Sequence, residues 1–294
     1  MSAPPLLTVI LPVYNCQDTI FSALHSLFNQ SFQDFEILLL EDGSTDQTLS
    51  IVKSIPDHRI HIIHDQVNKG LTMRLNQGVA LARGKYIARM DGDDFSFPLR
   101  FEKQIKFLEE HSEIDLLSTR SIAFKDTDYS ITGLLPYKQS HAEITKNLWN
   151  TIYMPHPTWM GKASWFKKNL YKIPEVKRVE DQELLLRTSA HSQFHCLDDV
   201  LLAYRQRHLE PRKIIATRKN LLNSQINFFL HHKQWSNLAK ATSAFFIKST
   251  FDYLAPIPYL NALIRKQKTT IIPEKIMREA QQHIKTIIEI EENA

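Results

Sequence analysis

Short, mostly apolar runs alternate with helical stripes along the first third of the chain. The runs, which suit strands buried on both faces of a sheet, lie at residues 7–11, 35–40, 60–63 and 86–89. Between them, apolar residues recur at helical spacing, as at Ile20, Leu24 and Leu27. Strands that alternate with helices of this length imply right-handed βαβ units and a parallel sheet. We therefore predict an α/β fold with a Rossmann-like, mainly parallel sheet flanked by helices.

The second half of the chain carries the same pattern less clearly and then changes. We expect strands at residues 115–119 and 130–135, a helix from residue 179, and a closing pair of strands at residues 194–204. Beyond residue 205 the apolar positions follow helical stripes at residues 222–229, 238–253 and 276–287. Pro256 and Pro258 interrupt this region. The pattern predicts a main domain at residues 1–208 and a helical C-terminal region at residues 209–294.

The amino-acid composition restricts the class of protein but does not identify its function. With 294 residues, 43% hydrophobic and 23% charged, the chain has enough apolar residues for a full core. No basic segment precedes Leu6 and Leu7, and no uncharged run reaches the length of a membrane span, so neither a signal peptide nor a spanning helix is expected. Cys16 and Cys196 are far apart in sequence, which favours reduced thiols in a cytosolic protein.

The charge is unevenly distributed along the chain. The net charge is +4, but residues 201–294 contain 15 Lys and Arg against 7 Asp and Glu. A basic region of this kind can contact an anionic membrane surface or a nucleic acid, and it can equally be the solvated face of a helix. The charge pattern alone does not decide among these.

Three carboxylates, those of Asp91, Asp93 and Asp94, follow the fourth predicted strand. In open α/β sheets, ligands bind in the crevice at the carboxyl ends of the strands. Like charges this close repel one another unless a cation lies between them. Oxygen ligands alone favour a hard divalent ion such as Mg²⁺ or Mn²⁺.

Several kinds of site share this acidic pattern. A solvated acidic turn remains open. An EF-hand loop does not fit, because Ser96 replaces the glycine of the sharp turn and Pro98 interrupts the loop. A phosphatase with an aspartate nucleophile does not fit either, because the motif comes late in the chain and Phe95 follows it. No G-x-G-x-x-G follows the first strand, which disfavours a dinucleotide site. A metal–diphosphate clamp is the further interpretation, and the pattern of the preceding ninety residues favours it.

Four segments follow one another in a fixed order at the ends of the predicted strands. They are Val9-Ile10-Leu11-Pro12-Val13-Tyr14-Asn15, Glu41-Asp42-Gly43-Ser44-Thr45-Asp46, Asn68-Lys69-Gly70-Leu71, and residues 84–94 with the Asp91-Gly92-Asp93-Asp94 motif. Together these segments make the chain resemble family 2 glycosyltransferases. The resemblance covers residues 6–205. It implies the GT-A fold, with a donor half at residues 1–95 and an acceptor half at residues 96–208, and a nucleotide-sugar donor.

The resemblance also implies roles for individual residues. The metal, Mn²⁺ or Mg²⁺, would be bound by Asp93 and Asp91, with Asp91 also able to orient ribose or metal-bound water. The nucleotide sugar would contact Pro12, Tyr14, Asn15, Asp42, Asn68, Lys69, Asp91 and Gly92. Within this set, Tyr14 would flank the base and Asp42 would accept a hydrogen bond from a uracil-type N–H.

Each of these donor-side residues also has a purely structural interpretation. Tyr14 can pack on the sheet edge, Asp42 can cap a helix, and Lys69 can be an ordinary loop lysine. Many relatives carry an arginine directly before the position of Asn76, whereas this chain has it one place earlier, at Arg74. A phosphate role for Arg74 is therefore in doubt.

The acceptor half contributes two further candidates. The segment around His156 resembles the His-Pro segment of bacterial members, so His156 could touch the acceptor or the diphosphate, or be a structural histidine. Residues 179–184 match the family's E-D-x-E-L, in which the aspartate is the base. We therefore expect Asp181 to be the general base, with Glu180 as the alternative. Acidic residues at this position can also serve the helix dipole alone.

The predicted activity, as the resemblance implies it, is inverting transfer of a sugar from a nucleotide-sugar, with a UDP-sugar as the expected donor, to a glycan or lipid-linked acceptor. The product would be a β-glycoside in surface polysaccharide or lipopolysaccharide synthesis. The chain lacks the Q-x-x-R-W motif of processive synthases, which favours single additions. Two alternatives fit less well. A sugar-1-phosphate nucleotidyltransferase would have a Gly-rich loop after the first strand, which this chain lacks. A degenerate member that only binds another transferase would not need the aspartates that this chain retains.

The expected partners follow from that activity. No nucleic-acid partner is expected, and the predicted location is the cytoplasm. The aromatic and basic C-terminal helices could make a peripheral contact with the inner face of the plasma membrane. Packing of these helices on the catalytic domain is the competing interpretation.

Overall fold

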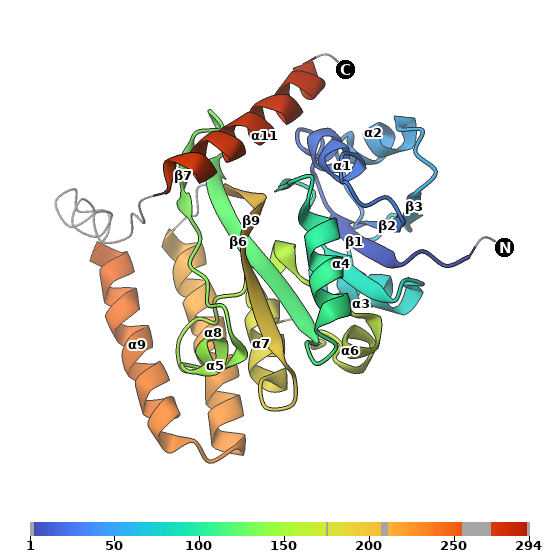
Figure 1. The fold of residues 1–294 in the computed structure, drawn as a ribbon. Coiled ribbons are helices and arrows are strands. Elements are labelled where there is room, and N and C mark those ends of the chain that lie inside the picture. Colours follow the sequence, from blue (N-terminus) through green and yellow to red (C-terminus); the bar gives the residue numbers. More distant parts are fainter. Residues whose placement is uncertain (1–2, 175, 207–210, 255–271, 293–294) are drawn as a thin grey trace.

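A single curled sheet runs through the computed structural model, which describes residues 3–174, 176–206, 211–254 and 272–292 (Figure 1). In these ranges the sheet has nine strands, in the order β3-β2-β1-β4-β8-β6-β9-β5, with β7 paired to β6. The strands are β1 (Leu7–Val13), β2 (Phe35–Glu41), β3 (Ile60–His64), β4 (Tyr86–Arg89), β5 (Phe95–Ser96), β6 (Leu116–Lys125), β7 (Ile131–Leu134), β8 (Met160–Lys162) and β9 (Phe194–Gln206).

The donor half is the parallel part of the sheet, as predicted. Strand β1 pairs in parallel with β2 and β4, and β2 pairs in parallel with β3. All residues of β1 and β2 are buried because helices cover both faces. Val9 and Leu11 point into one apolar cluster and Ile10 into another, following the two-residue period of a strand. The helices of this half are α1 (Ile20–Phe28), α2 (Thr48–Ser54) and α3 (Leu71–Leu81).

The acceptor half is mixed. Strand β8 runs antiparallel to both β4 and β6, whereas β6 and β9 are parallel. The 3₁₀ turn η1 (His156–Thr158) therefore enters the sheet beside the carboxyl end of β4, where the Arg89 N–H donates to the Trp159 carbonyl at 2.9 Å. The helices here are α4 (Arg100–Glu110), α5 (His141–Thr145), α6 (Ala163–Lys168) and α7 (Glu180–Thr188).

One local prediction in this half was wrong. Residues 194–206 form one continuous strand rather than a pair, because a register shift near Thr119 and Arg120 accommodates the polar Asp198 and Asp199 within it. Helix α4 begins at Arg100. The residues before it form β5, which pairs with β9 and is too short to show a strand period.

The C-terminal helices pack directly on the rest of the chain. They are α8 (Pro211–His231), α9 (Trp235–Leu254) and α11 (Glu274–Glu292). Phe229 of α8 is buried in the same apolar cluster as α7, and Ala280, Ile284 and Ile287 of α11 are buried against Phe95 and Phe97. Pro256 and Pro258 lie outside the described residues, as does the predicted boundary at residue 208.

Two expectations from composition can be compared with the structure. Cys16 and Cys196 are both free thiols. Within the described ranges, no helix combines the length and the apolar character needed to cross a bilayer.

The packing of α11 leads to a stability prediction. Ile284→Ala should lower the free energy of unfolding by about 2–4 kcal/mol, because it removes a buried side chain and leaves a cavity. Lys285→Ala, one position away and exposed, is the matched control and should change it by less than about 0.5 kcal/mol. Chemical denaturation measures both. Equal, small effects of the two substitutions would mean that α11 is not part of the cooperative fold.

Candidate active site

The loops that follow β1, β2 and β4 are hydrogen-bonded to one another at the carboxyl edge of the parallel strands. The Asn15 N–H donates to Ser44 Oγ at 3.0 Å, and Asn15 Oδ1 accepts from the Thr45 N–H at 2.9 Å. Thr19 Oγ1 donates to the Gly92 carbonyl at 2.9 Å. Asn15 has a φ of 50°, a left-handed conformation that asparagine tolerates better than most residues. Next to it, the Tyr14 side chain is 47% exposed.

Asp42 holds the loop that precedes α3. Its buried carboxylate accepts hydrogen bonds from the Lys69 N–H at 2.7 Å, from the Gly70 N–H at 3.0 Å and from Arg74 Nε at 2.8 Å. Gly43 packs so closely on this loop, at a φ of 72°, that a Cβ atom would lie 2.8 Å from the backbone nitrogen of Asn68. A carboxylate has about four acceptor sites, so three donors leave one for a nucleobase N–H. The base contact of Asp42 stays a prediction.

Arg74 has a structural task in the same loop. Its guanidinium is fully buried, pairs with Asp65 at 2.7 Å and donates to the Val67 carbonyl at 2.7 Å, in addition to its bond with Asp42. Lys69 pairs with Asp65 at the surface. The guanidinium of Arg74 is thus occupied by the loop itself, which explains why an arginine is tolerated at this shifted position.

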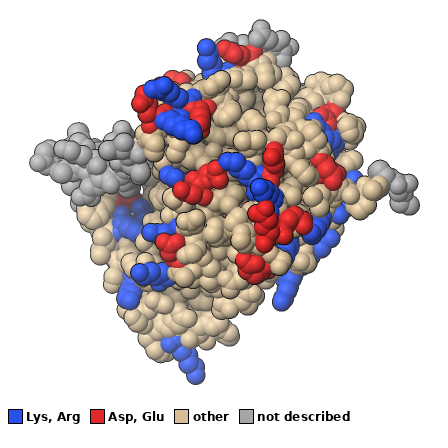
Figure 2. All heavy atoms as spheres, viewed as in Figure 1, with Lys and Arg blue, Asp and Glu red and all other residues tan. Residues whose placement is uncertain are grey.

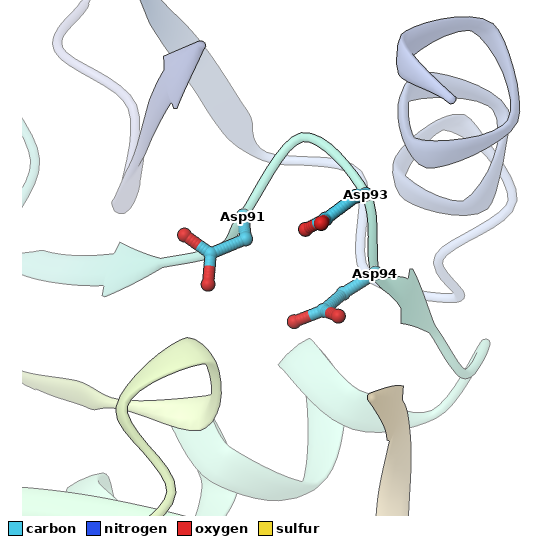
Figure 3. Close-up of side chains that lie close together, drawn as sticks. All are labelled: Asp91, Asp93 and Asp94. Carbon is cyan, nitrogen blue, oxygen red and sulfur yellow. The ribbon is translucent and has the colours of Figure 1, made fainter. Parts of the chain in front are cut away.

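The side chains of Asp91, Asp93 and Asp94 lie close together on the loop that follows β4 (Figure 3). One oxygen from each lies within 4.8 Å of the others. Asp94 is fully buried, and although its Oδ1 accepts from the Arg205 N–H at 2.9 Å, its Oδ2 has no hydrogen-bond partner among the described residues. Burial, together with the charges of Asp91 and Asp93, raises the pKa of Asp94 well above its usual range.

This donor set fits a divalent cation. Three carboxylates supply only hard oxygen ligands, and the unsatisfied Asp94 oxygen points to a missing positive partner. Asp91 and Asp93 were the expected ligands, and the structure brings them together. Asp94 was not assigned as a ligand from the sequence, although its place directly after Asp93 was a usable signal.

Two buried arginines, Arg89 and Arg100, lie next to the acidic residues. Arg89, the last residue of β4, pairs with Asp91, and its backbone carbonyl accepts from Arg100 NH2 at 2.7 Å. Burial acts to lower the pKa of Arg89, but the charges of Asp91, Asp94 and Glu180 outweigh it and raise that pKa. Its Nε and NH1 have no hydrogen-bond partner among the described residues. Neither arginine had been predicted as part of the site.

A third arginine, Arg205 of β9, forms hydrogen bonds with the acidic loop, residues 91–94. Its Nε donates to the Asp93 carbonyl at 2.8 Å, and its NH1 pairs with Asp126 at 3.0 Å. The guanidinium carbon lies 4.9 Å from the centre of the Phe124 ring and 5.2 Å from that of Phe95. Arg205 is therefore held by both charge and ring stacking, and it fixes the backbone that carries Asp93 and Asp94.

The acceptor-side candidates lie at the start of α7. His156 Nε2 is 2.7 Å from the Tyr171 hydroxyl, and its Nδ1 is 3.8 Å from Glu180 Oε1. Burial lowers the pKa of His156 well below its usual value, so the ring is neutral. Burial raises the pKa of Asp181, against the lowering effects of the Gln182 amide at 3.1 Å and of Arg89. The charge of Arg89 therefore acts on both the acidic loop and α7.

A substitution of Arg205 tests the cation site without changing any of the carboxylates expected to bind the cation. Arg205→Leu should weaken Mn²⁺ binding by about 10–100-fold, because it releases the backbone of Asp93 and Asp94. Arg120→Leu is the matched control, since Arg120 also pairs with a carboxylate, that of Asp198, and stacks on a ring, that of Tyr137, away from the loop. Calorimetry with Mn²⁺ compares the two. Equal Mn²⁺ affinities in both variants would contradict this role.

Known proteins match the chain over most of this region. The family model described as Glycosyl transferase family 2 matches residues 8–170, more than half of the chain. EpsE of Bacillus subtilis is 36% identical over 192 residues, which are 64% of this chain and 68% of EpsE. The Escherichia coli protein WfaP, a UDP-Glc:alpha-D-GlcNAc-diphosphoundecaprenol beta-1,3-glucosyltransferase, is 33% identical over 129 residues, 44% of this chain and 50% of WfaP.

Solved structures share the fold at low sequence identity. Staphylococcus aureus TarS 1–349 in complex with UDP-GlcNAc has a TM-score of 0.62 at 20% identity, covering 88% of this chain and 78% of that one. The mannosyltransferase PcManGT of Pyrobaculum calidifontis, in complex with GDP-Man and Mn²⁺, has a TM-score of 0.57 at 15% identity, covering 96% and 84%. The predicted GT-A fold is confirmed, and the chain belongs to glycosyltransferase family 2.

Proposed function

We propose that the protein is an inverting, metal-dependent glycosyltransferase that moves a sugar from a UDP-sugar to a lipid-linked glycan. The observation that carries this proposal is the convergence of Asp91, Asp93 and Asp94 at the carboxyl edge of β1, β2 and β4. That edge is where an α/β sheet binds ligands. Arg89 connects it electrostatically to the carboxylates of α7, so one site has both an acidic cluster and a candidate base.

The donor would lie along the edge formed by the three parallel strands. Tyr14 is exposed there and can stack on a base, and Asp42 keeps one acceptor site for a uracil N–H. Pro12, Asn15, Asn68, Lys69 and Gly92 shape the same edge and complete the proposed donor site. A uridine nucleotide is supported by WfaP, whose name specifies UDP-Glc, and by TarS, which was solved with UDP-GlcNAc.

The cation would be held by Asp93 and Asp94, with Asp91 as a third ligand or as the residue that orients ribose or metal-bound water. A bound Mn²⁺ or Mg²⁺ supplies Lewis-acid stabilisation of a departing diphosphate. Divalent metal use is supported by the oxygen-only donor set and by PcManGT, whose structure contains Mn²⁺. Arg89 pairs with Asp91 and keeps that carboxylate in place.

Inversion requires a single displacement at the anomeric carbon. The acceptor hydroxyl oxygen forms a bond to C1 as the bond from C1 to the diphosphate oxygen breaks, and UDP leaves with the electron pair. The hydroxyl proton passes to Asp181, whose raised pKa makes it a better proton acceptor than an exposed aspartate. An α-linked donor then gives a β-linked product. Neutral His156, hydrogen-bonded to Tyr171, lies on the acceptor side and can contact the incoming sugar.

The acceptor class is proposed from chemistry and from one relative. WfaP is named for a sugar linked to diphosphoundecaprenol, so a lipid-linked glycan in surface-polysaccharide synthesis is the acceptor that we favour. Hydrolysis and transfer assays with a panel of UDP-sugars and with GDP-mannose, each with and without Mn²⁺, test the donor. A GDP-sugar used in preference to every UDP-sugar would overturn the uridine assignment.

The metal clamp is tested directly by Asp93→Asn. This variant should reduce Mn²⁺-dependent UDP affinity by at least about tenfold while the fold stays intact, because it removes a ligand charge and also relieves carboxylate repulsion. Calorimetry of UDP with and without Mn²⁺ measures the effect. Asp115→Asn, on a carboxylate outside the cluster, is the control. Unchanged Mn²⁺-dependent affinity in Asp93→Asn would sink the assignment.

Asp181→Asn should separate catalysis from stability. Turnover should fall by about 10²–10⁴, with UDP affinity unchanged, because the proton acceptor is lost. A carboxyl whose pKa is raised by folding costs stability once pH exceeds its unfolded pKa, so stability falls as pH rises from that value to the folded one. Asparagine cannot ionise, so the variant should be more stable than wild type at neutral pH, and this advantage should vanish in acid.

Glu180→Gln is the companion variant to Asp181→Asn. Wild-type turnover in Asp181→Asn together with loss of turnover in Glu180→Gln would transfer the role of base to Glu180. Denaturation at neutral and acidic pH, measured alongside transfer, shows whether the stability change follows the residue that carries the raised pKa.

A further inference from the structure

The outer face of α9 exposes large apolar side chains that the fold does not cover. Phe246, Ile247, Phe251 and Tyr253 fall within two turns, and the exposed fractions of Phe246 and Tyr253 are 63% and 78%. Tyr253 falls at the end of the helical stripe predicted at residues 238–253, and the structure leaves it exposed. The packed side of α9 is formed by residues such as Leu238, Ala241 and Phe245, from which the position of Tyr253 has rotated away.

The same helical hairpin is strongly basic. Residues 211–254 contain 7 Lys and Arg and a single acid, Asp252. That acid is paired with Arg218, on the side where α9 packs against α8. Lys213, Lys219, Lys233 and Lys240 are exposed on the hairpin. In Figure 2 the lower left of the molecule, where Figure 1 shows α8 and α9, carries blue side chains on a largely uncharged surface with little red.

The hairpin is joined to the acceptor side of the site. Asn220 Nδ2 donates to the Lys177 carbonyl at 2.9 Å, three residues before Glu180. Gln225 Nε2 donates to the Leu148 carbonyl at 3.0 Å. Whatever α9 binds is therefore held in a fixed relation to the start of α7.

We propose that the outer face of α9, with the surrounding lysines of the α8–α9 hairpin, binds the surface of an anionic lipid bilayer. Exposed aromatic side chains on a helix suit the interface between headgroups and acyl chains, and clustered lysines suit anionic headgroups. The biological reason for such binding rests on the proposed function, because a lipid-linked acceptor would be presented at a membrane surface. Its physical basis, apolar exposure combined with one sign of charge, is independent of that function.

Charge also argues against a second copy as the occupant. A two-fold interface through this face would place two basic hairpins against each other, and like charges brought together in this way repel. An anionic surface would instead attract the basic hairpin. Self-association through α9 is nevertheless an outcome that the experiment can reveal.

The experiment measures sedimentation of the full chain with two kinds of vesicle. Phosphatidylcholine alone is compared with phosphatidylcholine mixed with phosphatidylglycerol. Wild type should bind only the anionic vesicles appreciably, and added salt should weaken that binding. The double variant Phe246→Ser/Tyr253→Ser should weaken it by at least about tenfold. Lys233→Glu/Lys240→Glu should weaken it by about fivefold or more for each lysine.

Matched controls use exposed positions elsewhere. Leu81→Ser on α3 and Lys275→Glu on α11 change exposed side chains away from the hairpin and should bind vesicles like wild type. Binding by the α9 variants equal to that of these controls, or no binding of wild type to anionic vesicles, would overturn the proposal. Gel filtration that shows a dimer abolished by Phe246→Ser/Tyr253→Ser would overturn it in favour of an interface between copies.

Failure of this proposal can be told apart from failure of the proposed function. UDP affinity with Mn²⁺ is measured on every variant and should match wild type, because the hairpin lies outside the donor loops. Loss of vesicle binding with intact UDP affinity supports the docking face. Vesicle binding by a protein that binds no UDP would leave the docking face standing and overturn the donor assignment instead.

Discussion

The mutual repulsion of three carboxylates is the constraint on which this site depends. One carboxylate oxygen each of Asp91, Asp93 and Asp94 lies within 4.8 Å of the others, and buried arginines hold the loop that carries them: Arg89 pairs with Asp91, and Arg205 donates to Asp94 and to the Asp93 carbonyl. These arginines come from separate elements: Arg89 from β4 and Arg205 from β9. Neither is a neighbour of the other in sequence, so the acidic loop can adopt its conformation only when both halves of the sheet are assembled.

The strand order explains how such distant segments meet. Strand β4 is the last parallel strand of the donor half, and β8 runs against it, so the residues just before β8 lie beside the end of β4. Strand β6 runs against β8, and β9 is parallel to β6, which brings the end of β9 to the same edge. For this reason the segment of His156 lies beside the end of β4, and Arg205 reaches the acidic loop. The antiparallel strand between two parallel sets turns a donor-binding edge into a two-sided site.

Sequence patterns predicted the donor half well because its strands are continuous apolar runs and its loops carry recognisable motifs. They predicted less where the determinants are distant in sequence. The two residues of β5 are too few to show a period, and the role of Arg205 depends on contacts with Asp93 and Phe124 that no local pattern encodes. The full burial of Arg74 similarly follows from Asp42 and Asp65, which lie on other elements.

Burial shifts the ionisation of the site in both directions at once. It raises the pKa of Asp94 and Asp181, and it lowers the pKa of Arg100 to about 9. Desolvation thus favours the neutral forms of these three groups, whereas at Arg89 the charges of the neighbouring acids outweigh it and raise the pKa. Such a site is stabilised by a ligand that brings both signs of charge with it. A nucleotide diphosphate accompanied by a divalent cation has that composition, and this agreement connects the energetics of the empty fold to the chemistry proposed for it.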